Sequence, residues 1–257
     1  MTSTDGKTYA LIDAGSGKKL AAALSASGAG VVRFPPLQTE ATILDEESQS
    51  IFTSFENDLN NFDWLIFTDI FAVDYFLQML ETSGTDFFEL DALNVCALGE
   101  AVADSLRFAS LHADVIPNFI DAEAVLAAVI DYVGKSELGE KRFLVVKRKT
   151  AGSEIEKELA SAGAAHVASL EIYQSEIASA DGAIPKLKAL LAGGAIDEFV
   201  FGAPADLLAL REFLPDLTLP EILRDIRVSA TDEVTLQNLR EHNLEAHYFR
   251  ENFRPLI

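Results

Sequence analysis

Basic side chains gather in one stretch of this acidic chain, which contains Lys141, Arg142, Lys147, Arg148 and Lys149. The last three follow the apolar run Phe143–Val146, whose β-branched residues are typical of a buried strand. Open α/β sheets bind ligands outside the carboxyl ends of their strands. Lys147 and Arg148 are therefore candidates for binding an anion. The alternative is that these side chains balance charge on a surface loop.

Tyr173 ends the predicted strand His166–Tyr173 and is a candidate acid. A phenol hydroxyl can donate a proton or a hydrogen bond to a bound ligand. If this strand also connects two domains, the side chain would project into the cleft between them. The alternative is an aromatic side chain that packs between the domains and takes no part in chemistry.

Two glycine-containing turns follow predicted strands. Gly99 precedes a predicted helix, and the first N–H groups of a helix favour a bound carboxylate. The Gly15-Ser16-Gly17 turn matches neither the dinucleotide-binding fingerprint nor the P-loop pattern. An ordinary strand–helix connection accounts for that second turn.

The sequence contains no pattern typical of a serine hydrolase or of a metal site. There is no Gly-x-Ser-x-Gly nucleophile turn, and the histidines (His112, His166, His242 and His247) lack metal-ligand spacing. Cys96, the single cysteine, lies in an apolar run and reads as a small core residue. These observations argue against a serine hydrolase, a zinc site and a cysteine nucleophile.

The elements that position these residues occur twice. A strand, a glycine-containing loop and an amphipathic helix run through residues 9–28 and again through residues 143–163, with an offset of 135 residues. The strand at 63–69 and its helix correspond to residues 197–214 at an offset of 134. A third pair, near Asn94 and Asp225, shows an offset of 130. Alternating strands and helices predict parallel sheets covered on both faces.

The repeat predicts two α/β domains, flavodoxin-like or Rossmann-like, that are interleaved in sequence. Pro35-Pro36 and the segment 169–176 read as extended crossings. One domain would hold residues 1–36 and 174–257, and the other residues 37–173. A two-stranded linker would join them, with a cleft between the domains for the ligand.

Composition limits the possible partners and locations. The 257 residues are 49% hydrophobic, which is enough for two cores, and the net charge is −21. Such a charge argues against binding to nucleic acid or to an anionic membrane. No apolar run reaches the ~20 residues of a membrane-spanning helix, and the N-terminus lacks a secretory pattern. A cytoplasmic protein is expected.

The order of motifs along nearly the whole chain resembles the uroporphyrinogen-III synthase family. The motifs are Asp-Trp-Leu-Ile-Phe-Thr at 63–68, Ala-Leu-Gly-Glu-Ala at 97–101, Asp-Val-Ile-Pro at 114–117, Val-Val-Lys-Arg at 145–148, Tyr173, Phe-Gly-Ala-Pro at 201–204 and Val-Ser-Ala-Thr at 228–231. Each motif is weak alone, and the resemblance rests on their order and spacing.

The resemblance implies two interleaved α/β domains and a lyase of porphyrin and heme biosynthesis. The implied reaction closes the linear tetrapyrrole hydroxymethylbilane to uroporphyrinogen III, with inversion of the last pyrrole ring and loss of water. It implies no metal and no organic cofactor, and a monomer is expected. The substrate bears eight carboxylates, so the site should offer backbone amides and hydroxyls to them.

The resemblance also implies site residues. Tyr173 matches the family's cleft tyrosine and is the candidate acid; the substrate-binding positions are Thr68, Gly99, Lys147, Arg148, Gly202, Ala203 and Thr231. Several positions depart from the family pattern: Thr68-Asp69 and Gly202-Ala203 replace a usual Thr-Ser, and Asp232 replaces a threonine. These departures leave open a family member that has lost catalysis and acts as a binding or interaction protein. A separate alternative is a two-domain binding protein for another small ligand, in which case the order of motifs would be coincidental.

Overall fold

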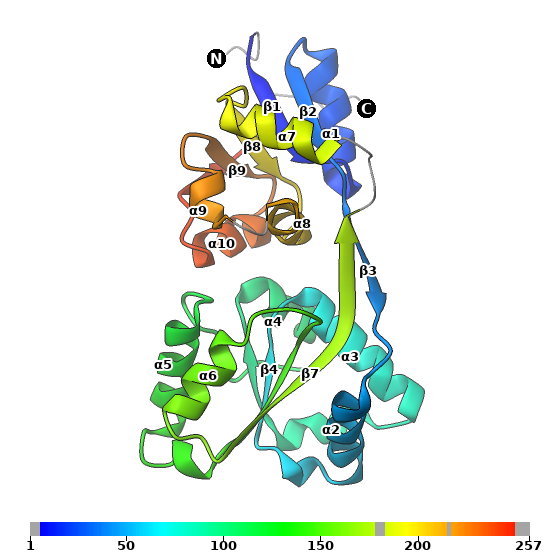
Figure 1. Cartoon of the computed structure of the whole chain (residues 1–257), viewed down its shortest axis with the longest axis vertical. Coiled ribbons are helices and arrows are strands. Elements are labelled where there is room, and N and C mark those ends of the chain that lie inside the picture. Colours follow the sequence, from blue (N-terminus) through cyan, green and yellow to red (C-terminus); the bar gives the residue numbers. More distant parts are fainter. Residues whose placement is uncertain (1–5, 178–182, 215–216, 250–257) are drawn as a thin grey trace. The chain divides into compact units, whose positions relative to one another are not determined.

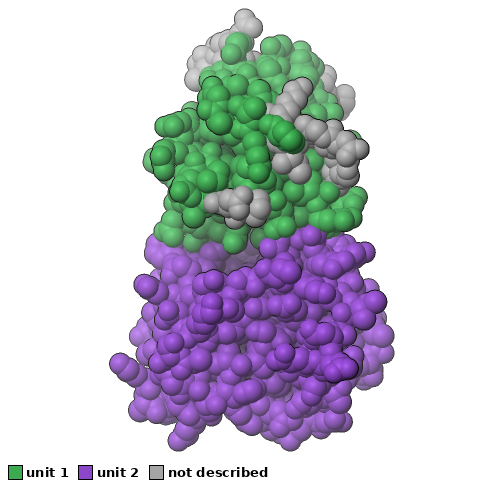
Figure 2. All heavy atoms as spheres, in the orientation of Figure 1, with its two compact units in different colours: residues 1–38, 176–257 green, residues 39–175 purple. Residues whose placement is uncertain are grey.

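The chain divides into two compact units in a computed structural model that describes residues 6–177, 183–214 and 217–249. Unit 1 comprises residues 1–38 and 176–257, and unit 2 comprises residues 39–175 (Figure 2). The sequence placed the corresponding crossings at 36/37 and 173/174. Residues 1–5 and 250–257, which the sequence assigned to the first domain, lie outside the described residues.

Unit 1 is built on a five-stranded sheet with the order β10-β9-β8-β1-β2 (Figure 1). Each neighbouring pair is parallel. The strands are β1 (Thr8–Ile12), β2 (Gly30–Phe34), β8 (Glu198–Phe201), β9 (Arg227–Ala230) and β10 (Ala246–Tyr248). This is the order of a flavodoxin-like sheet, in which the second strand lies outside the first.

The helices of unit 1 cover both faces of the sheet. They are α1 (Gly15–Ala26), α7 (Ala183–Ala192), α8 (Ala205–Phe213), α9 (Leu219–Ile222) and α10 (Glu233–Glu241). Alternate residues of β1 enter different cores: Tyr9 and Leu11 pack with α1, whereas Ala10 and Ile12 pack with α8 and α10. Burial on both faces explains why β1 and β8 read as continuous apolar runs.

Unit 2 is built on a second five-stranded sheet with the order β3-β7-β6-β4-β5. Its strands are β3 (Leu37–Ala41), β4 (Trp64–Phe67), β5 (Asn94–Ala97), β6 (Arg142–Arg148) and β7 (His166–Ile177). The β4–β5, β4–β6 and β6–β7 pairs are parallel. Val115 forms a single parallel bridge to Cys96 beyond β5.

Helices also cover both faces of the unit 2 sheet. The α-helices are α2 (Glu46–Asn57), α3 (Ile70–Ser83), α4 (Glu100–Phe108), α5 (Ala122–Val133) and α6 (Glu154–Ser161), with short 3-10 turns η1 (Leu59–Asn61), η2 (Phe87–Ala92) and η3 (Leu138–Glu140). Leu65 and Phe67 pack with α2, α3 and α4, and Trp64 and Ile66 pack with α5 and α6.

The two sheets share one topology, and the predicted fold class is confirmed. The order β2-β1-β8-β9-β10 corresponds to β7-β6-β4-β5 followed by the Val115 bridge, and β3 is an additional edge strand. The 134-residue offset holds for β4 and β8. The third offset was wrong: β5 begins at Asn94 and β9 at Arg227, an offset of 133 residues instead of 130.

Within residues 6–177, 183–214 and 217–249, no helix is both long and apolar enough to cross a membrane.

Candidate active site

In each sheet the strand order reverses at one point, and the predicted site residues lie around these two points. In an open α/β sheet, ligands bind at the carboxyl ends of the strands where the strand order reverses. This switch lies between β1 and β8 in unit 1 and between β6 and β4 in unit 2. We call the two regions the unit 1 edge (residues 13–17, 202–206 and 231–232) and the unit 2 edge (residues 68–69, 98–99 and 147–153).

At the unit 1 edge, the Gly202 carbonyl joins three loops. It accepts hydrogen bonds from Ser16 Oγ at 2.8 Å and from Thr231 Oγ1 at 3.5 Å. A Cβ atom on Gly202 would lie 2.5 Å from Ser16 Oγ and 3.1 Å from the Gly17 nitrogen, so a larger residue here would displace the Ser16 hydroxyl. Gly202 and Thr231 are predicted site residues that the structure brings together, whereas the sequence missed Ser16.

Asp206 was also missed, although it lies at the same place. Its Oδ2 atom accepts hydrogen bonds from the Gly202 N–H at 2.7 Å and the Ala203 N–H at 3.1 Å. Burial raises the pKa of the Asp206 carboxyl to about 6, against the lowering effect of the two N–H groups, and the nearby Asp232 carboxylate raises it further. The side chain is only 6% exposed. The turn after β8 is thus closed by a buried carboxylate.

Helices α1 and α4 begin at these edges without a capping side chain. Ala14 and Gly99 occupy the N-caps of α1 and α4, and neither side chain contains a hydrogen-bond acceptor. Gly99 has a φ of 96°, a conformation that favours glycine. The first N–H groups of an α-helix have no partner within the helix and attract anions. The starts of α1 and α4 can therefore donate hydrogen bonds to a bound anion.

Helices α3 and α10 also begin at these edges, and each is capped by an aspartate. Asp69 accepts from the Ala72 N–H at 2.9 Å and Asp232 from the Thr235 N–H at 2.8 Å. The preceding threonines donate to the same carboxylates, Thr68 at 3.0 Å and Thr231 at 3.2 Å. The negative charges that depart from the family pattern are thus offset by helix N-termini and hydroxyl groups.

The basic stretch is split by strand β6. Lys141 and Arg142 lie at its amino end, where Arg142 pairs with Asp63 at 3.0 Å, and Lys147 to Lys149 lie at its carboxyl end. The Lys147 side chain is 4% exposed. Its Nζ donates to the Gly152 carbonyl at 3.1 Å and pairs with the Glu156 carboxylate, which also accepts from Ser169. Lys147 therefore holds the loop between β6 and α6.

Arg148 and Lys149 lie nearer the surface of the unit 2 edge. Arg148 is partly exposed and donates from NH1 to Ser175 Oγ at 2.9 Å. The Lys149 side chain is exposed, and its backbone N–H donates to the Tyr173 carbonyl at 2.7 Å. These two cations are better placed for a ligand than Lys147.

Tyr173 lies in β7 within the core of unit 2. Its ring stacks on Tyr75 with centroids 5.4 Å apart and planes at 10°, and it contacts Phe71 at 5.8 Å. Tyr75 donates to Thr39 Oγ1 at 3.2 Å, so helix α3 and strand β3 hold the stack. The side chain is 2% exposed. All of these contacts lie within unit 2. The catalytic role of Tyr173 stays a prediction.

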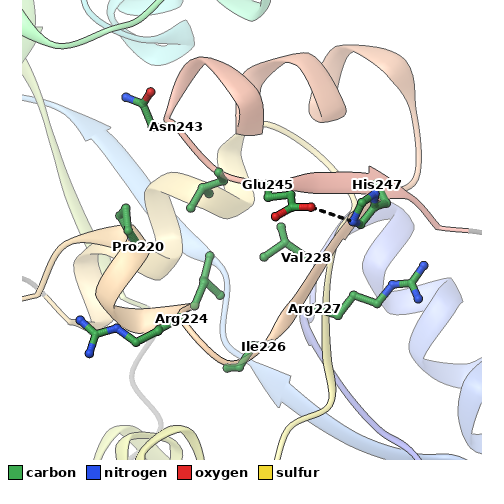
Figure 3. A pocket seen from close by; sticks show the side chains of 10 residues that line it. Pro220, Arg224, Ile226, Arg227, Val228, Asn243, Glu245 and His247 are labelled. Carbon is green, nitrogen blue, oxygen red and sulfur yellow. Dashed lines mark ion pairs between the residues drawn. The ribbon is translucent and has the colours of Figure 1, made fainter.

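A pocket of about 340 Å³ lies elsewhere on unit 1 (Figure 3). Its lining comes from Pro220, Leu223, Arg224, Ile226, Arg227, Val228, Asn243, Leu244, Glu245 and His247. These residues surround the amino ends of β9 and β10, opposite to the carboxyl ends. Arg227 pairs with Glu198 at 3.5 Å, and the Nε2 atom of His247 lies 4.0 Å from a carboxylate oxygen of Glu245. This pocket is therefore separate from the unit 1 edge.

No group of three or more His, Cys, Asp or Glu side chains in the described ranges is arranged to hold a metal ion. The Cys96 thiol is buried, and burial raises its pKa to about 12. It is therefore a core residue with little thiolate character.

Comparisons with known proteins agree with the order of motifs. The family model described as uroporphyrinogen-III synthase HemD matches residues 18–255. Two structures of uroporphyrinogen III synthase from Thermus thermophilus are similar in fold. The first has 20% identity and a TM-score of 0.60, and the second, a mutant form, has 19% identity and a TM-score of 0.61. Each match covers 96% of this chain and 94% of the other. A search of curated protein sequences finds no match. From the family match over most of its length, the chain belongs to the uroporphyrinogen-III synthase family.

Proposed function

We propose that this protein is a lyase that closes hydroxymethylbilane to uroporphyrinogen III, with inversion of the last pyrrole ring and loss of water. The observation that carries the proposal is the family match over residues 18–255. Structural support comes from the two edges, where hydroxyl groups and helix N-termini gather at the strand ends.

The proposed binding groups are those that can donate to carboxylates. They are the N–H groups at the starts of α1 and α4 and the Arg148 guanidinium. The hydroxyls of Thr68 and Thr231 join them by rotating from Asp69 and Asp232, to which they donate in the structure, toward the substrate. Gly99 contributes as the N-cap of α4. A guanidinium and backbone amides bind carboxylates through charge-assisted hydrogen bonds. Lys147, Gly202 and Ala203 act through the loops that they hold, because their donors are already engaged.

The proposed chemistry needs one proton donor. The C–O bond of the hydroxymethyl group breaks, and the departing hydroxide takes a proton and leaves as water. The freed carbon bonds to the substituted α-carbon of the last pyrrole ring, the bond from that α-carbon to its bridging carbon breaks, and the bridging carbon bonds to the ring's free α-carbon. That α-carbon loses a proton, which restores the proton donor. Tyr173 is the proposed donor, since the resemblance matches it to the family's tyrosine. Its stack on Tyr75 fixes the ring, which favours a defined position for the hydroxyl. Holding the flexible linear substrate in a folded form supplies the rest of the catalysis.

The location, oligomeric state and partners of the protein are part of the same proposal. We propose that the enzyme acts in the cytoplasm, as a monomer and without a nucleic-acid partner. The net charge of −21 supports the last of these, because a polyanion is repelled by such a surface.

The test is the isomer formed from freshly generated hydroxymethylbilane. Closure without an enzyme gives uroporphyrinogen I, so the type III isomer reports catalysis. Purified protein should give mainly type III, and heat-denatured protein should give only type I. If the native protein gives only type I, the chain belongs to the non-catalytic alternative. That alternative predicts that the protein binds hydroxymethylbilane without converting it.

A further inference from the structure

Two backbone N–H groups at the unit 1 edge converge on one carboxylate oxygen. Gly202 and Ala203 both donate to Asp206 Oδ2, at 2.7 Å and 3.1 Å. Successive N–H groups that point at one centre form an anion-binding concavity. Hydrogen bonds from such groups to an ionised carboxylate are stronger than neutral ones. We call Gly202 N–H and Ala203 N–H the amide pair.

In the corresponding turn of unit 2, the aspartate and the N–H group that it accepts from exchange positions. With the 134-residue offset of β4 and β8, Ala203 corresponds to Asp69 and Asp206 corresponds to Ala72. In unit 2 the aspartate at the first position accepts from the N–H of the second, at 2.9 Å. In unit 1 the aspartate at the second position accepts from the N–H of the first, at 3.1 Å. Each copy contains one carboxylate, and only in unit 1 does it occupy an amide pair.

The Asp206 side chain is enclosed as well as bonded. It is 6% exposed, and the carboxylate of Asp232 on the neighbouring loop is close enough to raise its pKa. A buried carboxylate next to another one is unfavourable unless hydrogen bonds offset the cost. The amide pair offsets part of that cost: its two N–H groups lower the pKa of Asp206, although burial raises this pKa by more.

The amide pair is connected to the predicted binding residues through Gly202. The Gly202 carbonyl, which accepts from Ser16 and lies 3.5 Å from Thr231 Oγ1, belongs to the same peptide group as the Ala203 N–H. Because this N–H donates to Asp206, the carboxylate fixes the peptide group that the Ser16 and Thr231 hydroxyls contact. A small misplacement of a binding group can reduce activity strongly.

We propose that the amide pair of unit 1 is a carboxylate-binding site that the protein fills with its own Asp206, and that Asp206 is thereby a positioning residue for the reaction. The positioning role rests on the proposed function, whereas the carboxylate site does not. Removal of the side chain leaves a space in which a small carboxylate, such as formate, can take its place.

The test compares Asp206→Ala with Asp206→Asn, each with and without formate. Asp206→Ala should have a lower thermal midpoint that rises with formate concentration and does not respond to chloride. Asp206→Asn keeps an oxygen that accepts from both N–H groups, so neither it nor the wild-type protein should respond to formate. In the isomer assay, Asp206→Ala should lose roughly 10- to 100-fold in kcat/KM, mainly through KM, and formate should restore part of it.

A second variant covers the case in which Asp206→Ala does not fold. The double change Ala203→Asp with Asp206→Ala places the carboxylate where unit 2 has it, which caps the turn and leaves the amide pair open. Its thermal midpoint should respond to formate. No response in either variant, or an equal response in the wild-type protein, would overturn the carboxylate site. An inactive wild-type protein whose alanine variants respond to formate would overturn only the proposed function.

Discussion

Replacing Lys147 by methionine distinguishes a structural lysine from a substrate-binding one. The change keeps most of the aliphatic stem and removes an ammonium whose side chain is 4% exposed. It leaves the Glu156 carboxylate, 13% exposed, with Ser169 as its donor and removes the bond to the Gly152 carbonyl. Breaking a buried pair in this way costs about 3–5 kcal/mol. We therefore expect unit 2 to lose about 3–5 kcal/mol of stability.

Urea unfolding measured by tryptophan fluorescence gives this quantity for unit 2. Trp64, the single tryptophan, is fully buried in the core of unit 2 that also contains Phe143 and Leu159, so it reports on this unit. With a slope of ~1–3 kcal/mol per molar urea, the midpoint should fall by about 1 M or more. Lys141→Met is the matched control. Its partner Glu137 lies at 3.9 Å and is 63% exposed, so the control should lose no more than ~0.5 kcal/mol.

A double variant completes the argument. Lys147→Met with Glu156→Gln removes both charges and keeps an acceptor for Ser169, so most of the lost stability should return. A Lys147→Met protein with the wild-type midpoint and a raised KM would refute this reasoning. It would instead support direct contact between Lys147 and the substrate.

Tyr173→Phe keeps the ring that packs on Phe71 and Tyr75; the rate of type III formation should fall by roughly 10²–10⁴-fold, and an unchanged rate in the isomer assay would remove Tyr173 from the mechanism. The net charge of −21 repels an octacarboxylate, so kcat/KM should rise when ionic strength increases from about 0.01 to about 0.15 M, because the screening length falls from ~30 to ~8 Å; a decrease would mean that local cations dominate. The pKa of Asp206 rises from 3.8 to about 6 in the folded state, so the folded state binds this proton more readily and the group's contribution to stability falls as pH rises through that window, by about 3 kcal/mol. Urea unfolding followed by circular dichroism should show that the stability of Asp206→Asn, relative to the wild-type protein, increases between pH 4 and 7. If the stabilities of the two proteins changed equally with pH, this would count against a buried charge at Asp206.

Much of the fold could be predicted because parallel sheets covered on both faces leave a strong signal. The runs at Trp64–Phe67 and Phe143–Val146 are apolar at every position, as strands buried on both faces should be. The end of β7 was harder to predict. The predicted strand stops at Tyr173, whereas β7 continues to Ile177 through polar residues that pair at the edge with β3.

The site could be predicted only in part. The positions of Thr68, Gly99 and Thr231 follow from the strand ends, which the pattern locates well. The burial of Lys147 depends on Glu156, nine residues later, and on a loop in which Thr150 has a φ of 66°. Such tertiary pairing leaves no periodic signal. Asp206 is one of 41 acidic residues, and its place shortly after Gly202, the glycine that follows β8, was the available hint.

The fraction of uroporphyrinogen III formed at increasing protein concentration, with the amount of hydroxymethylbilane held constant, tests the central claim most directly. Enzymatic closure competes with spontaneous closure for the same substrate. If the protein is a synthase, the type III fraction should rise with protein concentration until type I is nearly absent. A type III fraction that stays at the level of the protein-free reaction at every concentration would contradict the account.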